Sequence, residues 1–378
     1  MTIDVAHWTA ETRRGGAALA GLRDDWEDLY RRCSRATPFQ SHAWLDSWWR
    51  SYGTPDGLVL TLVRRSGQLV AAAALVRRRR GIGVFTFAGA GVSDYGDVLV
   101  DDDCAEEAAR RLGQELAAQA RRRVIDLAEV PTSAALWQVV TAWPGHAWQV
   151  PASTCLELPG VSLEEILSEL PVRAARRRRK EVRKLTEAGV QARVTAPDNV
   201  AGTVHDMLVL HRRQWRGRGM TPEHGRARFA EHLTRSLSAM VPRGQAELME
   251  FRLDDQLMAV NVLMVAHGMV GAYLYGVEPA LRERIDVVAL MLYHDLAETR
   301  RLGRPVLSLM RGDEPHKQRW RPRHVRNQRV LLAGSGWVGP LYMSVVQARA
   351  RLAPFVKQHL PVVHNAARRV RKWLTSFT

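Results

Sequence analysis

The chain has 378 residues, 46% of them hydrophobic, which is enough apolar material for more than one buried core. This composition excludes a disordered chain, and a formal net charge of +16 predicts affinity for polyanions such as nucleic acid, phosphorylated cofactors or anionic lipid head groups. The three scattered cysteines and the histidines show no metal-ligand spacing, so we expect no structural metal and a reducing compartment.

The first 21 residues are polar and charged, unlike a signal peptide, which needs an uninterrupted apolar stretch. A membrane-spanning helix needs roughly 18 or more consecutive apolar residues. The most apolar stretch, from Val330 to Val346, is broken by glycines, Ser335 and Pro340. We therefore expect a cytoplasmic protein that does not span a membrane.

The first half of the chain reads as a β-hairpin followed by a helix and a strand. Apolar residues predict strands over Leu58–Val63 and Gln68–Val76, joined by a turn at Ser66-Gly67. A helix is expected over Ala105–Ala120 and a strand over Arg123–Leu127. We place an N-terminal domain at residues 1–155, with the boundary near Pro151 to Pro159.

A strongly basic run extends from Arg173 to Lys184. Such a run can bind nucleic acid in a salt-dependent manner. Apolar residues at helical spacing surround it, however, so a helix with one packed face and one solvated basic face is the favoured interpretation.

A second hairpin is predicted over Ala246–Leu253 and Gln256–Ala266, with Asp254-Asp255 as its turn. Its sequence Gln256-Leu257-Met258-Ala259 echoes Gln68-Leu69-Val70-Ala71, which suggests a duplicated fold. A strand over Met269–Val277, a helix over Asp286–Leu302 and a strand over Pro305–Met310 follow. This order defines a C-terminal domain at residues 156–335 in a mixed α/β fold.

The C-terminal residues 336–378 are predicted to form a basic amphipathic helical tail, broken at Pro361. The tail either packs against its own protein or rests peripherally on an anionic membrane. Truncation would separate these alternatives.

The predicted order of strand, helix and strand places a ligand crevice between Tyr275-Gly276 and Met310-Arg311. The helix N-terminus at Asp286 and Val287, together with Arg282 and Arg284, suits a pyrophosphate. This connection lacks the glycines that let a backbone approach phosphate, and Asp286 as an ordinary N-cap fits equally well.

Reactive side chains are dense directly after the last strand, at Asp313, Glu314, His316 and Lys317. An amine must lose a proton before it attacks, so Glu314, Asp313 and His316 compete as the general base. Backbone N–H groups near Tyr275 could hold the developing oxyanion. The alternative is a loop of ion pairs that positions Trp320.

Two further groups of residues are candidates for substrate contacts. His211 and Trp215 lie four apart on a predicted helix and share a face, where a packed core histidine is the usual explanation. Asp94, Tyr95 and Asp97 follow a glycine-rich loop and either reach the substrate cleft or make structural Asx hydrogen bonds.

Four segments together resemble the tandem-GNAT acetyltransferase family associated with bacterial cellulose and exopolysaccharide gene clusters, whose relatives include the Fem-type aminoacyl transferases. The segments are residues 38–49, 93–97, 210–215 and 311–320. The resemblance implies two GNAT-like domains, of which the C-terminal one is active, and an acyl-CoA donor.

Two positions depart from the family pattern: His316 stands where a Tyr is usual, and Arg284-Ile285-Asp286 replaces a Ser-Pro-Gly turn. The favoured function is an acyl-CoA-dependent N-acyltransferase that acts on a primary amine. The alternatives are a Fem-type ligase that takes an aminoacyl group from tRNA, and a catalytically silent GNAT-like binding module.

Overall fold

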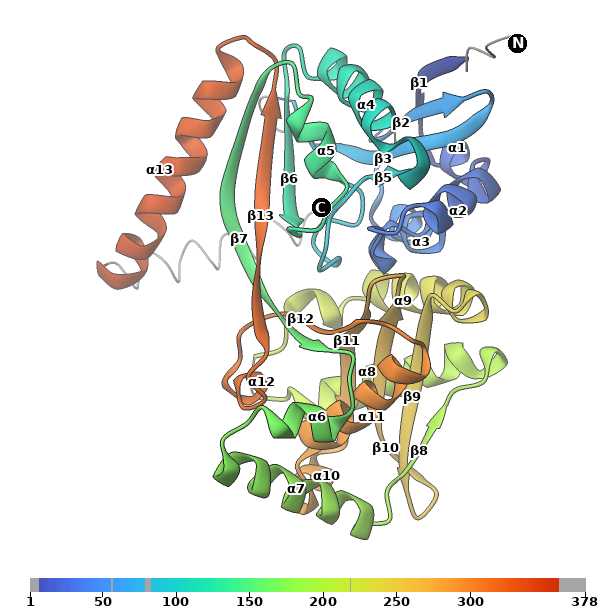
Figure 1. Ribbon diagram of the computed structural model, residues 1–378, viewed down its shortest axis with the longest axis vertical. Helices are drawn as coiled ribbons and strands as arrows, with labels where there is room; N and C mark the ends of the chain where they lie inside the picture. The colour runs from blue at the N-terminus through green and yellow to red at the C-terminus, as the bar shows by residue number, and fades with distance from the viewer. Residues whose placement is uncertain (1–6, 56, 79–82, 218, 360–378) are drawn as a thin grey trace.

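One mixed sheet runs through the whole protein in the computed structural model, which describes residues 7–55, 57–78, 83–217 and 219–359 (Figure 1). Its order is β1-β2-β3-β4-β6-β13-β7-β12-β11-β10-β9-β8, with β5 paired to β3. The strands are β1 Trp8–Arg14, β2 Leu58–Arg65, β3 Gln68–Arg78, β4 Val84–Phe87, β5 Leu99–Val100, β6 Val124–Val130, β7 His146–Pro159, β8 Gln191–Val194, β9 Ala246–Leu253, β10 Gln256–Val265, β11 Val270–Val277, β12 Val306–Arg311 and β13 Arg323–Ala333.

Helices flank both halves of this sheet. They are α1 Gly16–Ala20, α2 Arg23–Arg32, α3 His42–Tyr52, α4 Ala105–Gln119, α5 Leu136–Thr141, α6 Leu163–Ser168, α7 Val172–Glu187, α8 Val200–Gln214, α9 Ala227–Met240, α10 Pro279–Arg284, α11 Val287–Arg301, α12 Pro315–Gln318 and α13 Val338–His359. The predicted strands and helices of both halves are confirmed, with bounds that differ by a few residues.

The two halves repeat one order of elements, as the echo between the hairpins suggested. Strands β2 and β3 form a hairpin, β4 follows, and α4 leads to β6, which pairs with β4 in parallel. In the second half β9, β10, β11, α11 and β12 repeat this order, and β11 pairs with β12 in parallel. The predicted duplication is therefore a property of the fold.

Both hairpins turn through two residues with positive φ. Ser66 and Gly67 have φ of 48° and 86°, and Asp254 and Asp255 have φ of 49° and 60°. Positive φ at both central residues is typical of a type I′ turn, whose twist matches that of the flanking strands. The sharing of this turn extends the similarity of the halves from order to local geometry.

The centre of the sheet joins the halves through β7 and β13. Strand β13 comes late in the chain, yet it lies between β6 and β7 and pairs with both. Strand β7 pairs with β13 along most of its length and with β12 at its end, so residue 155 lies within a strand that both halves share. Figure 1 shows these two long strands connecting the upper and lower halves.

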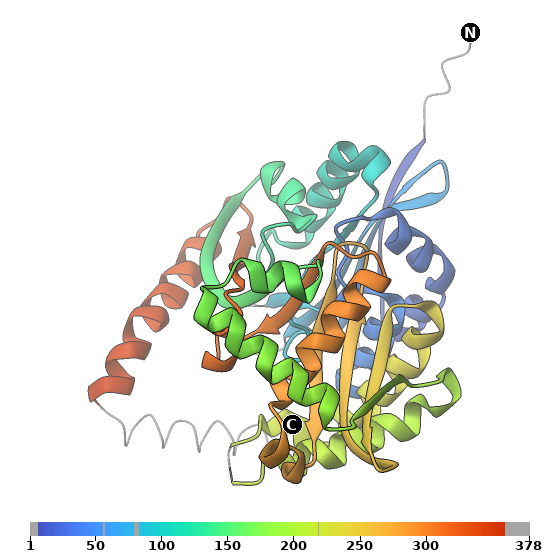
Figure 2. The same ribbon diagram turned by 60° about the horizontal axis from the view of Figure 1, so that its bottom comes forward.

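Helix packing divides the interior into two main hydrophobic clusters. The larger cluster includes the N-terminal half together with residues of α8 and α9, and α3 packs directly on α9. The second cluster lies among α6, α7, α11 and the strands of the C-terminal half. Figure 2 shows α6 and α7 lying close to α11 on one side of the sheet.

The basic run after residue 172 forms the helix α7, as predicted. Ala175, Arg178 and Leu185 are buried, whereas the other basic residues of the helix are exposed. The Arg178 guanidinium lies 5.5 Å from the centre of the Trp320 ring and pairs with Glu181. The helix is therefore held by Ala175, Leu185 and Arg178 on its packed face and presents a charged outer face to solvent.

The predicted C-terminal helix is present as α13, while residues 360–378 lie outside the described part of the chain. Met343 and Val346 of α13 pack against Val124, Leu331 and Ala333 of the sheet.

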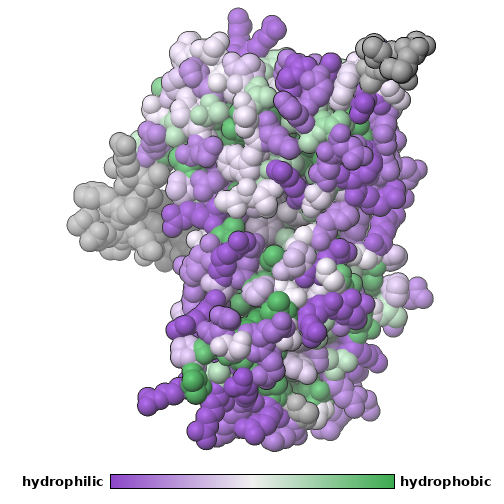
Figure 3. Space-filling model, viewed as in Figure 1, coloured by the Kyte–Doolittle hydropathy of each residue, from purple (hydrophilic) through white to green (hydrophobic). Residues whose placement is uncertain are grey.

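On the surface of the molecule, hydrophobic and hydrophilic residues are interspersed on the face shown in Figure 3. In the described ranges no helix combines the length and apolar character that crossing a membrane requires.

Candidate functional site

A cavity of about 270 Å³ opens where β11 and β12 diverge. The two strands pair at Val270 with Leu307 and at Gly271 with Ser308, after which β12 is held by β7 instead. Its walls come from β11, β12, α11, the loop after β12, and the end of α8. The lining residues are Asp94, His211, Trp215, Gly219, Thr221, His224, Asn261, Ala272, Tyr273, Leu274, Tyr275, Val288, Met291, Leu292, Asp295, Leu309, Met310, Arg311, Glu314, His316, Lys317 and Trp320.

The cavity brings together seven of the residues that the sequence singled out: Asp94, His211, Trp215, Tyr275, Glu314, His316 and Lys317. Asp313 is exposed and does not line it. Tyr95, Arg282, Arg284 and Val287 line other cavities, and Gly276 serves helix packing. The catalytic and binding roles of all these residues stay predictions.

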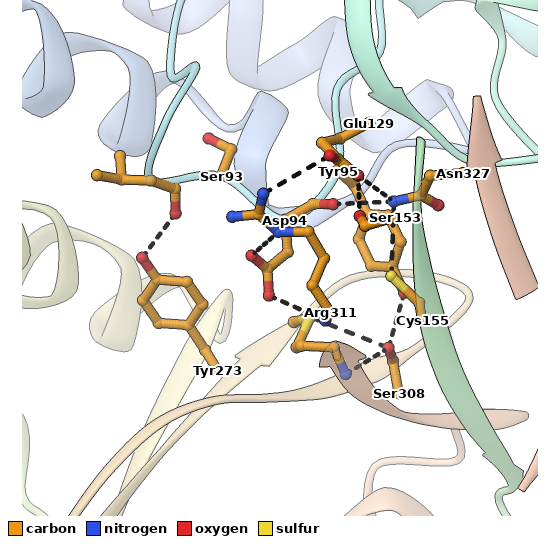
Figure 4. A network of polar contacts seen from close by, with 12 residues as sticks. Ser93, Asp94, Tyr95, Glu129, Ser153, Cys155, Tyr273, Ser308, Arg311 and Asn327 are labelled. Carbon is orange, nitrogen blue, oxygen red and sulfur yellow. Dashed lines mark hydrogen bonds and ion pairs between the residues drawn. The ribbon is translucent and has the colours of Figure 1, made fainter. Parts of the chain in front are cut away.

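Residues from both halves meet at one end of the cavity (Figure 4). The Arg311 side chain donates to Asp94 at 2.6 Å, and its backbone N–H donates to the other carboxylate oxygen at 3.3 Å. The Tyr273 hydroxyl donates to the Val92 carbonyl at 2.7 Å. Asp94 thus reaches across to the C-terminal half, as one of its two interpretations required.

The other two residues of that loop make hydrogen bonds inside the protein. Tyr95 is buried and shares a hydrogen bond of 2.8 Å with Ser308, whose hydroxyl also accepts from the Met310 N–H at 3.1 Å. Asp97 accepts the backbone N–H groups of Ala135 and Leu136, both at 2.8 Å. The contacts of Tyr95 and Ser308 fix the end of β12, where Met310 has an unusual φ of 57°, and those of Asp97 fix the start of α5.

A second cavity of about 550 Å³ adjoins the first and shares Arg311 with it. Glu129, which has a φ of 59°, lines this cavity and lies 3.7 Å from the Arg311 guanidinium. Glu129 also accepts hydrogen bonds from Ser153 and from Asn327, as Figure 4 shows. Arg311 therefore lies between the two cavities, with the Asp94 carboxylate on one side and the Glu129 carboxylate on the other.

Lys317 forms the polar wall after β12. Its ammonium lies 2.8 Å from the Glu314 carboxylate and donates to the Arg311 carbonyl at 3.1 Å. Partial burial raises the pKa of Glu314, but the hydrogen bond and charge of Lys317 outweigh it and leave the pKa below its usual value. Burial lowers the pKa of His316, which leaves a neutral imidazole at this wall.

The opposite wall carries two histidines, of which His224 was not found from the sequence. His211 comes from α8, whereas His224 lies in a short 3-10 helix, Pro222–Gly225, in the connection between α8 and α9. Burial lowers the pKa of both, that of His224 to about 4 with a further contribution from His211. Trp215 lies next to His211, with ring centres 6.2 Å apart.

A buried acid on α11 also escaped the sequence analysis. Asp295 is 2% exposed and accepts a hydrogen bond of 2.7 Å from the Asn261 side chain. Burial raises its pKa well above the usual value. A signal was present, because Asp295 follows Met291 and Leu292 on the apolar face of the predicted helix, where an acid is rare.

The start of α11 lies at a third cavity, of about 480 Å³, lined by Lys184, Arg282, Arg284, Asp286, Val287 and Arg319 among others. The Asp286 carboxylate accepts the N–H groups of Val288 and Ala289 at 3.1 and 3.2 Å. It therefore occupies the donors that a phosphate would use. The buried Nε of Arg282 has no hydrogen-bond partner among the described residues.

Gly276 is needed where β11 approaches α8. A Cβ atom at this position would lie 2.2 Å from the Met207 carbonyl oxygen and 2.8 Å from the His211 nitrogen. The glycine thus lets α8 pack closely on the strand and brings His211 to the cavity.

In the described ranges no group of three or more His, Cys, Asp or Glu side chains is arranged to hold a metal ion.

Comparison with known proteins supports a GNAT fold. A family model described as acetyltransferase (GNAT) domain matches residues 173–318, which contain the cavity walls from α8 to the loop after β12. A search of curated proteins gave no significant match.

Solved structures extend the similarity over both halves. The chain is similar to FemX, with a TM-score of 0.60 and 12% identity over 89% of this chain and 99% of that one. It is also similar to a Bacteroides thetaiotaomicron protein of unknown function, with a TM-score of 0.55 and 10% identity over 85% of this chain and 100% of that one.

A third similar structure is the C-terminal domain of a putative lysylphosphatidylglycerol synthetase from Agrobacterium fabrum, with a TM-score of 0.53 and 11% identity over 88% of this chain and 96% of that one. At such identities the likeness concerns the fold. The protein is a mixed α/β chain with two GNAT-like halves and a C-terminal helix.

Proposed function

We propose that this protein transfers an acyl group from acyl-CoA to the primary amine of a small molecule, sugar or peptide. The observation that carries the proposal is the cavity between the diverging strands β11 and β12, which lies in the part of the chain that matches the GNAT domain. Its apolar residues on α11 and β11 suit an acyl chain and its carrier arm.

The phosphates of the donor would lie at the start of α11. Arg282, Arg284, Lys184 and Arg319 supply positive charge there, and the unpaired Arg282 Nε supports an anion at this place. The carrier arm would then pass Val288, which lines both this cavity and the one between the strands.

The acceptor amine would approach through the second cavity, past Arg311. Asp94 and Glu129 flank that arginine, so the passage is polar and carries both signs of charge. This makes an acceptor with several polar groups a better fit than a purely apolar amine. A relationship to the cellulose and exopolysaccharide type of acetyltransferase is consistent with such an acceptor and remains part of the proposal.

A Fem-type aminoacyl transfer is the second candidate, and two observations favour it. Asp286 occupies the α11 donors that a pyrophosphate would need. The outer face of α7 offers a row of exposed basic residues next to that helix start, of the kind that binds a nucleic-acid backbone: Arg173, Arg176, Arg177, Arg179, Lys180, Arg183 and Lys184.

Release of free thiol from acetyl-CoA and longer acyl-CoA esters, measured with a panel of amines, tests the first function. Gel shifts with charged tRNA at low and high salt test the second. Thiol release that requires an amine supports acyl-CoA transfer, and tRNA binding without thiol release supports the aminoacyl alternative. Absence of both would favour a silent binding module, whereas turnover that disappears in Glu314→Gln or Asp313→Asn variants would exclude it.

A further inference from the structure

Two histidines from different segments make a continuous chain of hydrogen bonds along one wall of the cavity. Nδ1 of His211 lies 2.7 Å from the Tyr275 carbonyl oxygen. Nε2 of the same ring lies 3.2 Å from Nδ1 of His224. Both rings line the cavity, so the chain runs from the strand β11 to the ligand space.

The chemistry of the partners fixes the position of each proton. A carbonyl oxygen can only accept, so Nδ1 of His211 carries a proton and donates to Tyr275. Nε2 of a neutral His211 then has a lone pair and accepts from Nδ1 of His224. Nε2 of His224 is left with a free lone pair, and it has no hydrogen-bond partner among the described residues.

Packing holds the two rings in this arrangement. His224 stacks on Phe229 with ring centres 4.7 Å apart, and His211 is 5% exposed. The close contact between Gly276 and α8 fixes the position of His211 relative to strand β11. Burial keeps both imidazoles neutral near pH 7, which is the state that the proton assignment needs.

We propose that His224 is the base that takes a proton from the acceptor amine, and that His211 is a positioning residue that fixes its tautomer through the Tyr275 carbonyl. The inference rests on the proposed acyl transfer and names its base. It replaces Glu314 in that role because the Glu314 carboxylate is bound to Lys317, whereas the His224 lone pair is free.

The neutral amine nitrogen attacks the thioester carbonyl carbon, a C–N bond forms, and the carbonyl electron pair moves to oxygen. His224 Nε2 takes one proton from the nitrogen. The C–S bond then breaks, the electron pair leaves with sulfur, and the proton held by His224 passes to the thiolate directly or through solvent, which gives the thiol and returns His224 to its neutral form. The amine enters without the extra proton of its ammonium form, which is released to solvent.

The charges around the pair come from several elements. On their own segments the neighbouring charged groups are Arg212 and Glu223, and Arg212 and burial both disfavour a charged His211. Across the cavity stand His316, the Lys317–Glu314 ion pair and the Arg311–Asp94 ion pair. Each of these ion pairs is internally neutralised, so burial and the neighbouring ring dominate the environment of His224.

The first arm of the test separates the proposed base from the proposed function. The wild-type protein is assayed for amine-dependent thiol release with acyl-CoA and for amide formation with aminoacyl-tRNA, and the working donor is used in every later step. Absence of thiol release with every acyl-CoA ester overturns the proposed function, and absence of turnover with both donors also removes the need for a catalytic base. Donor binding by calorimetry is recorded for each variant to show that the cavity is intact.

With the working donor, His224→Gln is expected to lower kcat/KM by roughly 10²- to 10⁴-fold, the range of a lost general base, while the donor Kd stays within about twofold. His294→Gln is the matched control, because His294 is a half-buried histidine with a lowered pKa that does not line the cavity. It should keep wild-type turnover. A His224→Gln variant with turnover like that of this control would overturn the proposal.

Nitrogen-15 NMR of histidine-labelled protein supplies a readout that needs no donor. The proposal requires the Nδ1–H tautomer for both His211 and His224, with His224 changing to a mixture in a His211→Phe variant. A wild-type His224 with its proton on Nε2, or a His224 tautomer that is unchanged in His211→Phe, would overturn the positioning role even where turnover falls.

Discussion

At the scale of single residues, the charged groups that line the cavity are of two kinds. Those of the polar wall are paired with groups of opposite charge, whereas one buried acid is not. Lys317 is paired with Glu314, and Arg311 with Asp94. Among the described residues the Asp295 carboxylate receives one side-chain hydrogen bond, from the Asn261 amide, and burial, with a further contribution from the charge of Glu298, raises its pKa. Its carboxyl is therefore neutral in the folded protein under conditions where it ionises in the unfolded chain.

Asp295→Asn should be more stable than the wild type at pH 8 and about equal to it at pH 4. An acid whose pKa is raised in the folded protein binds more protons there than in the unfolded chain. The free energy of unfolding therefore falls as pH rises above the pKa of the acid in the unfolded chain. This loss of stability is at most about 1.4 kcal/mol per pH unit, and an asparagine, which does not titrate, avoids it. Urea unfolding at several pH values measures this, and a variant less stable than the wild type at pH 8 would contradict it.

Some of these residues could be predicted from the sequence, and others could not. Glu314 and Lys317 were visible as a cluster after a predicted strand, and Asp295 could have been recognised as an acid on an apolar helix face. His224 could not be found, because it reaches His211 only when the loop between α8 and α9 folds back. Local pattern carries no information on such a contact.

At the scale of elements, the close approach of β11 to α8 positions the histidine wall. Gly276→Ala should lower the free energy of unfolding by about 1 to 3 kcal/mol, because its Cβ would overlap the Met207 carbonyl oxygen. Gly202→Ala on the same helix is the control, since its Cβ meets nothing within 4 Å and should raise stability by roughly 0.5 to 1 kcal/mol. Equal effects in urea titrations would contradict this account of the contact.

The capping residue of α11 makes a separate prediction. Asp286→Asn keeps the N-cap and removes a negative charge from the proposed phosphate site, so donor affinity should rise about 3- to 10-fold with little change in stability. Asp286→Ala should lose about 1 kcal/mol of stability because the cap is removed. Calorimetry and thermal unfolding provide the two readouts, and an unchanged donor Kd in Asp286→Asn would argue against phosphate binding here.

The elements that were predicted well are those with local signals. Two-residue turns between clusters of apolar residues predicted both hairpins, and Asp286 marked the start of α11. Strand β13 was not predicted, because its place between β6 and β7 depends on partners about two hundred residues away along the chain. The same holds for the packing of α3 on α9.

At the scale of the whole molecule, the contact between α3 and α9 ties the halves together through His232. This residue is fully buried, lies 3.1 Å from the Ser47 hydroxyl, and has an Nε2 atom without a partner among the described residues. Burial, with a smaller contribution from Arg235, lowers its pKa to about 3.

A fall in pH should therefore destabilise the contact between α3 and α9 that holds the two halves together. A histidine whose folded pKa lies below its unfolded value of about 6.5 binds more protons when unfolded, so stability rises with pH through this window and is lost as pH falls. His232→Gln should reduce this slope by up to about 1.4 kcal/mol per pH unit between pH 4 and 6. An unchanged slope in denaturant titrations would show that another group carries the dependence.

The central claim is that an acyl-CoA donor binds between β11 and β12. Isothermal titration of acetyl-CoA and longer acyl-CoA esters into the wild type and an Ala272→Trp variant tests it most directly, because Ala272 lines the cavity and an indole there would fill it. The account predicts binding to the wild type and at least about tenfold weaker binding to the folded variant. No binding of any ester to the wild type, or equal binding to both proteins, would contradict it.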